Sequence, residues 1–288
     1  MGQNRLMIGR TLVVAKHHTP NSLRVTARRA MLEGRNARMW WSVPVSARCE
    51  FANVYHCAVQ KTASQWINAI FSDPIVYRYS DLLPYVPRYY NWRHPQPFPP
   101  GRIVLSLFVS RKAFVKIPKP PRYRAFYVQR DPRDIVVSSY FSTRDSHTPM
   151  GDIPEQRKIL RQLPVKEGML HLIGHLAKKG TFRSLRSWAT APEDEAVLLV
   201  RYEDLTGERQ AEEFGRVLRH CGISIPPDDL DTLLSRYSFS NMRGRQASGA
   251  HYRKGAAGDW RNHFDDDIDE VFTQATGDLV TLLGYPAR

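Results

Sequence analysis

The chain has 288 residues, 42% of them hydrophobic, 24% charged and 11% aromatic, and this composition excludes a disordered, fibrous or collagen-like protein. Its 42 Lys and Arg residues outnumber its 28 Asp and Glu residues, so the net charge of +14 predicts an anionic partner: a phosphate, a sulfate, a nucleic acid or an acidic membrane surface. The 3 cysteines have no CxxC spacing, which argues against a disulfide framework and a structural zinc site, and no apolar run approaches the ~20 residues of a membrane helix. We therefore expect a cytoplasmic protein with reduced thiols and no transmembrane segment.

Residues 1–50 are predicted to form a basic arm, because they hold nine basic and only two acidic side chains. Within it, residues 22–32 have the pattern of a basic helix with Ser22 as its cap. Two interpretations remain open for this arm. It is either a solvated segment or a weak contact to a membrane surface or another polyanion.

Residues 51–288 are predicted to form one α/β domain, since short apolar runs alternate there with amphipathic stretches. This pattern is typical of a mostly parallel sheet flanked by helices. Strands are expected at 54–60, 103–109, 124–129 and 196–201, and helices at 64–71, 132–141, 156–177, 210–221, 227–234 and 268–283. The Pro-, Tyr- and Arg-rich stretch 74–121 and the polar stretch 239–258 are expected to be mostly loop.

A first anion-binding motif follows the first predicted strand. Residues 60–66 read Gln-Lys-Thr-Ala-Ser-Gln-Trp, and the turn directs backbone N–H groups and Lys61 toward one point. The glycines of a Walker A loop are missing, which argues against a nucleoside triphosphatase or kinase. Taken alone, the segment is also compatible with an ordinary βα turn.

A second motif follows the strand 124–129. Asp131 is a good helix cap and Pro132 a good first helical residue, so Arg130 is left at the carboxyl end of the strand, where α/β sheets bind ligands. Ser138, two turns into the helix, can present its hydroxyl to the same anion. The alternative is that Arg130 only forms a structural ion pair with Asp134.

A third motif covers residues 253–262, Arg-Lys-Gly-Ala-Ala-Gly-Asp-Trp-Arg-Asn. Two adjacent cations followed by glycines allow the backbone to close over a phosphate, although a basic surface loop has the same composition.

Together and in this order, the three motifs resemble those of sulfotransferases that use 3′-phosphoadenosine 5′-phosphosulfate (PAPS). Residues 61–66 resemble the family's Lys-Ser-Gly-Thr-Thr-Trp loop, and Arg130, Asp134 and Ser138 match its 3′-phosphate motif. Tyr202-Glu203-Asp204, the Ser-Phe-x-x-Met element at 238–242 and residues 253–262 match three further elements. The resemblance spans about residues 51–284 and implies a three-layer, P-loop-like fold.

The resemblance also implies roles for single residues. Lys61, Thr62, Ala63, Ser64 and Gln65 would hold the 5′-phosphosulfate, and Lys61 would stabilise the charge on the leaving phosphate oxygen. Trp66, Phe239 and Tyr202 would contact the adenine. The 3′-phosphate would be held by Arg130, Ser138, Arg253, Lys254 and Gly255. No metal ion is implied, because lysine and backbone donors can stabilise a transferring sulfuryl group.

The sequence departs from the family at two positions. Ala63 replaces a glycine, which we interpret as a position that needs only close approach rather than a positive φ. Pro118 stands where many members have the histidine of a Lys-Thr-His motif, while Lys116 matches the motif's lysine and, with Lys61, is expected to be a catalytic residue.

The general base must therefore be sought elsewhere. His147, which follows the 3′-phosphate helix, is the first candidate, because an imidazole suits deprotonation of a hydroxyl near neutral pH. His94, His251, Asp145 and Asp152 are alternatives. His56 alternates within a predicted strand and is interpreted as a core histidine.

The function expected from the resemblance is sulfuryl transfer to a hydroxyl, less favourably an amine, of a small molecule or glycan. A homodimer is compatible with the sequence. Two other hypotheses stay open: an inactive relative that only binds the nucleotide, and a basic nucleic-acid-binding protein. The second leaves the ordered motifs unexplained, and a nucleic-acid partner is not expected.

Overall fold

The computed structural model describes residues 21–87, 95–245 and 257–287. The chain divides into two compact units, with the boundary between Pro44 and Val45. The first unit contains the helix α2 (Asn21–Ser42), which extends ten residues beyond the predicted 22–32. Within the described ranges, no helix combines the length and the apolar character that crossing a membrane requires.

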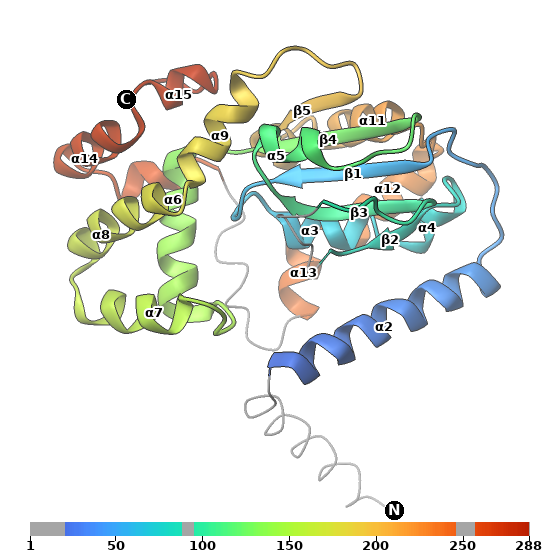
Figure 1. The fold of residues 1–288 in the computed structure, drawn as a ribbon, viewed down its shortest axis with the longest axis horizontal. Coiled ribbons are helices and arrows are strands. Elements are labelled where there is room, and N and C mark those ends of the chain that lie inside the picture. Colours follow the sequence, from blue (N-terminus) through green and yellow to red (C-terminus); the bar gives the residue numbers. More distant parts are fainter. Residues whose placement is uncertain (1–20, 88–94, 246–256, 288) are drawn as a thin grey trace, which may run out of the picture. The chain divides into compact units, whose positions relative to one another are not determined.

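The second unit is built on a five-stranded sheet in the order β2-β3-β1-β4-β5, in which every neighbouring pair is parallel (Figure 1). The four predicted strands are confirmed, with bounds that shift by one or two residues, and the short β2 was not predicted. Because all strands run in one direction, their carboxyl ends meet at one edge of the sheet. The strands are β1 (Asn53–Ala58), β2 (Leu83–Tyr85), β3 (Arg102–Phe108), β4 (Tyr123–Gln129) and β5 (Val197–Arg201).

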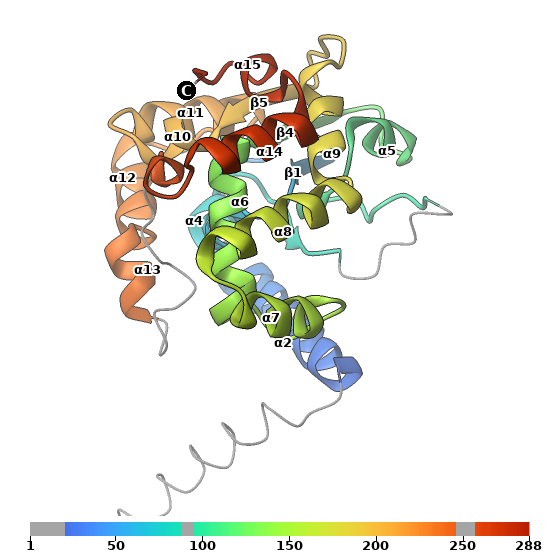
Figure 2. The same ribbon diagram turned by 90° about the vertical axis from the view of Figure 1, so that its left-hand side faces the viewer.

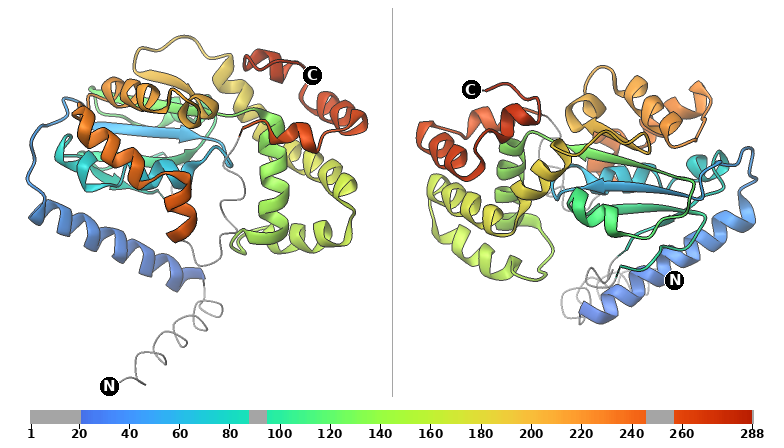
Figure 3. Two further views of the ribbon diagram at one scale, coloured as in Figure 1. Left: turned by 180° about the vertical axis from the view of Figure 1, so that it is seen from behind. Right: turned by 45° about the horizontal axis from the view of Figure 1, so that its top comes forward.

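Helices cover both faces of the sheet, which gives the three layers expected for the fold (Figure 3). On one face, Val54 and Phe126 pack in a core with Ile67 and Phe214. That face is covered by α3 (Ser64–Ile70), α4 (Pro74–Arg78), α11 (Gln210–His220) and α12 (Pro227–Arg236).

On the opposite face, α5 (Arg111–Lys116) and α9 (Thr181–Ala189) contribute Phe114 and Trp188. The Trp188 ring stacks on Tyr127 with 4.4 Å between centroids, and its Nε1 donates to the Val109 carbonyl at 2.8 Å.

A group of helices lies beyond the carboxyl ends of the strands and has its own core (Figure 2). Its centre is formed by Ile135, Met169, Ile173 and Phe272, all at most 1% exposed. Its elements are α6 (Pro132–Phe141), the π-helix η1 (Ser142–Ser146), α7 (Ile153–Gln162), α8 (Val165–Lys178), α14 (Asp266–Thr276) and α15 (Leu279–Leu282).

Two helices predicted as continuous are each divided. The prediction of one helix over 156–177 is wrong, because Pro164 separates α7 from α8. Proline has no backbone N–H to donate, so the helix does not continue through this position. The predicted 268–283 helix ends at Gly277, whose φ of 62° stops α14.

The two stretches expected to be mostly loop contain some regular elements among their described residues. Residues 74–121 include α4, β2, β3 and α5. Asp73 caps α4 by accepting from the Ile75 amide, and Ser110 caps α5 by accepting from Ala113. The second stretch begins with α13 (Phe239–Arg245), and α10 (Tyr202–Thr206) was also missed.

β3 carries a bulge beside the middle of β1. Tyr55 pairs with Val104 but Cys57 pairs with Leu107, so two residues of β3 face the single residue His56. Ser106 adopts a left-handed φ of 59° there, and its amide donates to His56 Nδ1 at 3.3 Å.

Candidate nucleotide site

The parallel sheet brings together the residues that follow three adjacent strands. Lys61 follows β1, Arg130 follows β4 and Tyr202 follows β5. In an α/β sheet, this edge is where ligands bind. These three residues therefore form the centre of the candidate site.

The loop after β1 is held in an unusual backbone conformation. Lys61 and Ala63 have φ angles of 72° and 60°, in the left-handed region that disfavours side chains with a Cβ. Our interpretation of Ala63 as a close-approach position is therefore wrong, because the backbone adopts the positive φ that a glycine would supply without strain. The Thr62 hydroxyl stabilises the turn by donating to the Val59 carbonyl at 2.9 Å.

Arg130 connects the loop to the helix α6. Its Nη1 donates to the Lys61 carbonyl at 3.1 Å, and its Nη2 lies 3.6 Å from Asp134 Oδ2. Its guanidinium lies 4.3 Å above the Tyr202 ring, which is favourable for a cation over an aromatic face. The buried Nε has no hydrogen-bond partner in the described part of the chain. The expected ion pair with Asp134 thus exists, yet the Nε of the same guanidinium remains without a hydrogen-bond acceptor among the described residues.

Lys61 and Arg130 together concentrate positive charge. Burial, and to a smaller extent the Arg130 charge, together lower the pKa of Lys61 from 10.5 to about 8. Arg130 pairs with Asp134, and no ion pair between described residues joins Lys61 to a carboxylate, so the two neighbouring cations favour an anionic ligand.

Asp134 connects the second motif to the third. The carboxylate is 1% exposed and accepts from the Gly258 amide at 2.7 Å and the Trp260 amide at 2.9 Å. Trp260 belongs to the short 3-10 helix η2 (Asp259–Asn262), and the Arg133 guanidinium lies 3.6 Å from its ring centroid. The described parts of all three motifs are therefore joined by hydrogen bonds and one ion pair, although Arg253, Lys254 and Gly255 themselves lie outside the described residues.

The candidate adenine residues flank the loop. Trp66 on α3 donates its Nε1 to the Tyr237 carbonyl at 2.8 Å, and this contact brings the start of α13 near the first motif. Phe239, the first residue of α13, is 36% exposed, whereas Tyr202 is 5% exposed beneath Arg130.

The remaining predicted residues differ in accessibility. Ser64 is buried and Gln65 is exposed at the start of α3, and Ser138 is partly buried on α6. Lys116 is exposed at the last position of α5, and no hydrogen bond or ion pair between described residues joins it to Lys61.

His147 follows η1 and shares the electrostatic environment of Lys61. Its Nδ1 lies 2.9 Å from the Thr148 carbonyl, so this nitrogen carries the proton of the neutral ring and the lone pair is on Nε2. Burial lowers the pKa of His147, and the charges of Lys61, Arg157 and Lys179 lower it further. The neutral imidazole that a general base requires is therefore favoured near pH 7.

The other candidate bases are less suitable or lie outside the described residues. Asp145 pairs with Arg144 at 3.0 Å, and Asp152 pairs with His175 at 2.9 Å and Lys179 at 3.1 Å. His94 and His251 are outside the described ranges.

His56 is confirmed as a core histidine. It is 0% exposed, its ring stacks on Phe126 at 5.0 Å, and burial lowers its pKa to about 3.

The sequence did not reveal what holds η2. The i,i+4 spacing of Arg130 and Asp134 predicts their ion pair. Nothing in that spacing indicates that the same carboxylate binds backbone amides more than 120 residues away.

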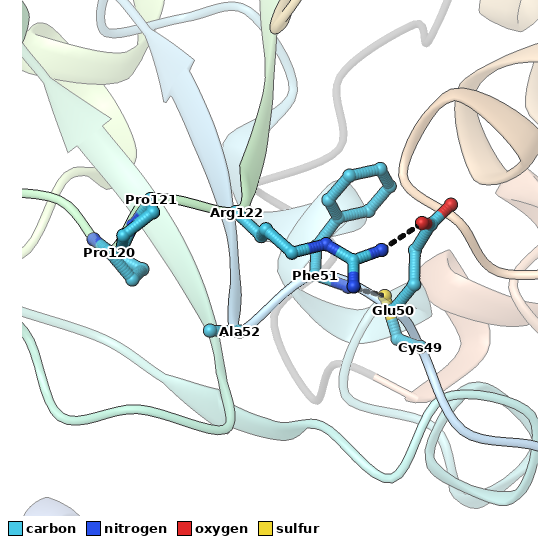
Figure 4. Close-up of a pocket in the computed structure, with 7 residues that line it drawn as sticks. All are labelled: Cys49, Glu50, Phe51, Ala52, Pro120, Pro121 and Arg122. Carbon is cyan, nitrogen blue, oxygen red and sulfur yellow. Dashed lines mark hydrogen bonds and ion pairs between the residues drawn. The ribbon is translucent and has the colours of Figure 1, made fainter.

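Among the described residues, two of the hollows near the sheet lie at its opposite edges. The one in Figure 4 is lined by Phe51, Pro120, Pro121 and Arg122 among others, and it lies where β1 and β4 begin. Its ion pair, between Arg122 and Glu50, has side chains about 60% exposed. The second hollow borders Asp131, Gly258 and Trp260, and only this one lies next to the network around Arg130.

Comparisons with known proteins agree with this geometry. A family model described as a sulfotransferase domain matches residues 105–284. A 3-alpha-hydroxysteroid sulfotransferase of Cavia porcellus is 27% identical over 178 residues, which cover 57% of this chain and 58% of the relative. Human sulfotransferase 2A1 is 24% identical over 195 residues, which cover 60% of this chain and 64% of the relative. The matches therefore span less than two thirds of these relatives.

A structural comparison extends further along the chain. The crystal structure of mouse sulfotransferase SULT7A1 complexed with PAP (3′-phosphoadenosine 5′-phosphate) superposes with a TM-score of 0.55 at 18% identity. The superposition covers 87% of this chain and 93% of the mouse chain, so the two share a fold.

Proposed function

The chain belongs to the sulfotransferase domain family, and we propose that it transfers a sulfuryl group from PAPS to a hydroxyl group of an acceptor molecule. The donor carries charged groups at both ends of its ribose, at the 3′-phosphate and at the 5′-phosphosulfate. The proposed binding edge has cations from two adjacent strands, which suits a ligand of this charge pattern.

The pairing of Lys61 with Arg130 is the observation that carries the proposal. The Arg130 guanidinium donates to the Lys61 carbonyl at 3.1 Å, burial and the Arg130 charge lower the pKa of Lys61, and Arg130 Nε lacks a partner among the described residues. Burying an unpartnered donor costs free energy that a bound oxyanion can recover by accepting a hydrogen bond. A phosphate or sulfate oxygen is such an acceptor.

The residue roles are those that the resemblance to the family implies. The loop after β1, with Lys61, Thr62, Ala63, Ser64 and Gln65, holds the 5′-phosphosulfate. Arg130 and Ser138 hold the 3′-phosphate together with Arg253, Lys254 and Gly255. The adenine lies among Trp66, Tyr202 and Phe239. No contact between described residues supports a role for Lys116 in this arrangement.

Transfer proceeds by in-line displacement at sulfur. The acceptor oxygen forms a bond to sulfur while the bond from sulfur to the bridging phosphate oxygen breaks, and PAP leaves. His147 Nε2 accepts the acceptor's hydroxyl proton, and Lys61 stabilises the negative charge that develops on the leaving oxygen. One such preorganised donor is worth a factor of roughly 10² to 10³ in rate.

Ligand-induced thermal stabilisation tests the nucleotide assignment. PAP should raise Tm clearly more than adenosine 5′-phosphate, because only PAP carries the 3′-phosphate that Arg130 binds. The substitution Arg130→Ala should remove this difference. Arg122→Ala is a matched control, because it removes an exposed cation at the opposite edge of the sheet. Equal Tm shifts for the two nucleotides on the wild-type protein would contradict the assignment.

Activity is tested separately with ³⁵S-labelled PAPS and a mixture of hydroxylated small molecules and glycans. We expect label to appear on an acceptor and to depend on Lys61. Binding of PAP without labelling of any acceptor would instead indicate an inactive nucleotide-binding protein.

A further inference from the structure

We propose that Asp134 is a positioning residue that fixes the segment 258–260 against Arg130 and thereby sets the preference for a nucleotide with a 3′-phosphate. This inference rests on the proposed nucleotide function. The negative charge of Asp134 is in apparent contradiction with a phosphate site. A carboxylate next to a phosphate site repels the ligand, and Asp134 lies 3.6 Å from the cation that would bind it.

The contacts of the carboxylate resolve this contradiction. Its shortest contacts are to main-chain donors, Gly258 N at 2.7 Å and Trp260 N at 2.9 Å, with one oxygen used for each. The 3.6 Å separation from Arg130 Nη2 exceeds a hydrogen bond. Asp134 therefore binds the backbone of η2 tightly and leaves Arg130 able to donate to a ligand.

The segment that Asp134 holds begins at a flexible residue and continues into a fixed one. Gly258 has a φ of 80°, a conformation that glycine adopts freely and that its backbone alone does not fix. Trp260 is 3% exposed and lies between Arg133 at 3.6 Å and Arg261 at 4.6 Å. These contacts fix the ring, while the two amide hydrogen bonds fix the direction of the chain toward Arg130.

An ionised carboxylate is required for both bonds at once. Asparagine has one oxygen, so its amino group would face one of the two backbone N–H donors. Glutamate keeps the charge but is one methylene longer, so it cannot place both oxygens at the same amides without moving α6 or η2. The substitutions Asp134→Asn and Asp134→Glu therefore separate charge from position.

The experiment compares PAP with adenosine 5′-phosphate by calorimetry on the full chain. In Asp134→Asn and in Asp134→Glu, the affinity for PAP should fall at least tenfold while that for adenosine 5′-phosphate changes less than twofold. Hydrogen exchange without nucleotide should show lost protection at the Gly258 and Trp260 amides. Glu213→Gln is the matched control: this carboxylate is also buried, and it pairs with Arg209 and Arg216 on α11.

Each result decides the question. An unchanged affinity ratio despite lost amide protection would overturn the positioning role, and a ratio reduced equally in Glu213→Gln would show general destabilisation. If Asp134→Asn does not fold, Asp134→Glu carries the same test. A wild-type protein that binds both nucleotides equally would refute the proposed function itself, independently of the amide protection.

Discussion

The lowered pKa of Lys61 predicts that PAP binding depends on pH in the range where free lysines do not titrate. In the empty site, burial and the neighbouring Arg130 lower the pKa of Lys61 to about 8. A bound phosphate raises this pKa again, because an adjacent negative charge stabilises the ammonium form. Above pH 8, binding must therefore take up a proton.

The magnitude follows from the fraction of charged Lys61. With a pKa of about 8, roughly 90% of the side chains are charged at pH 7 and roughly 10% at pH 9. If only the charged form binds, the affinity for PAP falls about tenfold between these values, or about 1.4 kcal/mol. The ligand contributes little, since the second pKa of a phosphate monoester is about 6.

Titration calorimetry at pH 7, 8 and 9 measures both quantities. In buffers of different ionisation enthalpy, the observed heat should reveal uptake of close to one proton at pH 9 and little at pH 7. Lys61→Arg is the control, because an arginine remains charged throughout this range, so its affinity should stay constant. A flat wild-type profile, or an equal decrease in Lys61→Arg, would refute the reasoning.

Three further predictions concern single residues. Ala63→Gly should increase the free energy of unfolding by about 1 kcal/mol in urea titrations, because glycine adopts a φ of 60° without strain; a decrease would show that the methyl group packs favourably. His147→Ala should lower kcat much more than it weakens PAP binding. The acidic limb of the wild-type pH–rate profile, which lies below pH 6.5 because burial lowers the pKa of His147, should disappear in this variant. An unchanged kcat would exclude His147 as the base. Thr62→Val should lower stability by about 1 kcal/mol through loss of the hydrogen bond to Val59 and unpairing of a buried carbonyl, whereas retained Tm would show that water replaces the hydroxyl.

The sheet was largely predictable because its buried strands leave a continuous apolar signal. All six residues of β1 are buried, and such a run indicates an internal parallel strand. β2 has only three residues, one of them Pro84, so it gives no comparable pattern. Pro164 is a sequence signal for the break between α7 and α8. The apolar periodicity continues on both sides of this proline, and for that reason one helix was predicted over 156–177.

The site was predictable where a residue directly follows a strand. Lys61 and Arg130 are found in this way, since the carboxyl edge of a parallel sheet is known once the strands are known. Lys116 was chosen by motif position alone, and it lies at the far end of a helix. The contacts of Asp134 join residues 124 and 126 positions apart in the chain, and only the tertiary structure reveals such pairings.

The bulge in β3 has a consequence for the surface beside the Lys61 loop. Residues of a regular strand alternate between faces, but Val104 and Leu107, three positions apart, pack in the same core cluster. Because of the extra residue, Leu107 lies on the same face of the sheet as Val104, although a regular strand would place residues three positions apart on opposite faces. Phe108, which pairs with Ala58 at the end of β1, is left 43% exposed at the carboxyl edge. Deleting Ser106 alone would remove the bulge and its amide contact to His56 but leave Leu107 opposite Cys57 and Phe108 opposite Ala58, so the extra residue shapes the backbone beside His56 while the aromatic ring keeps its place at the carboxyl edge.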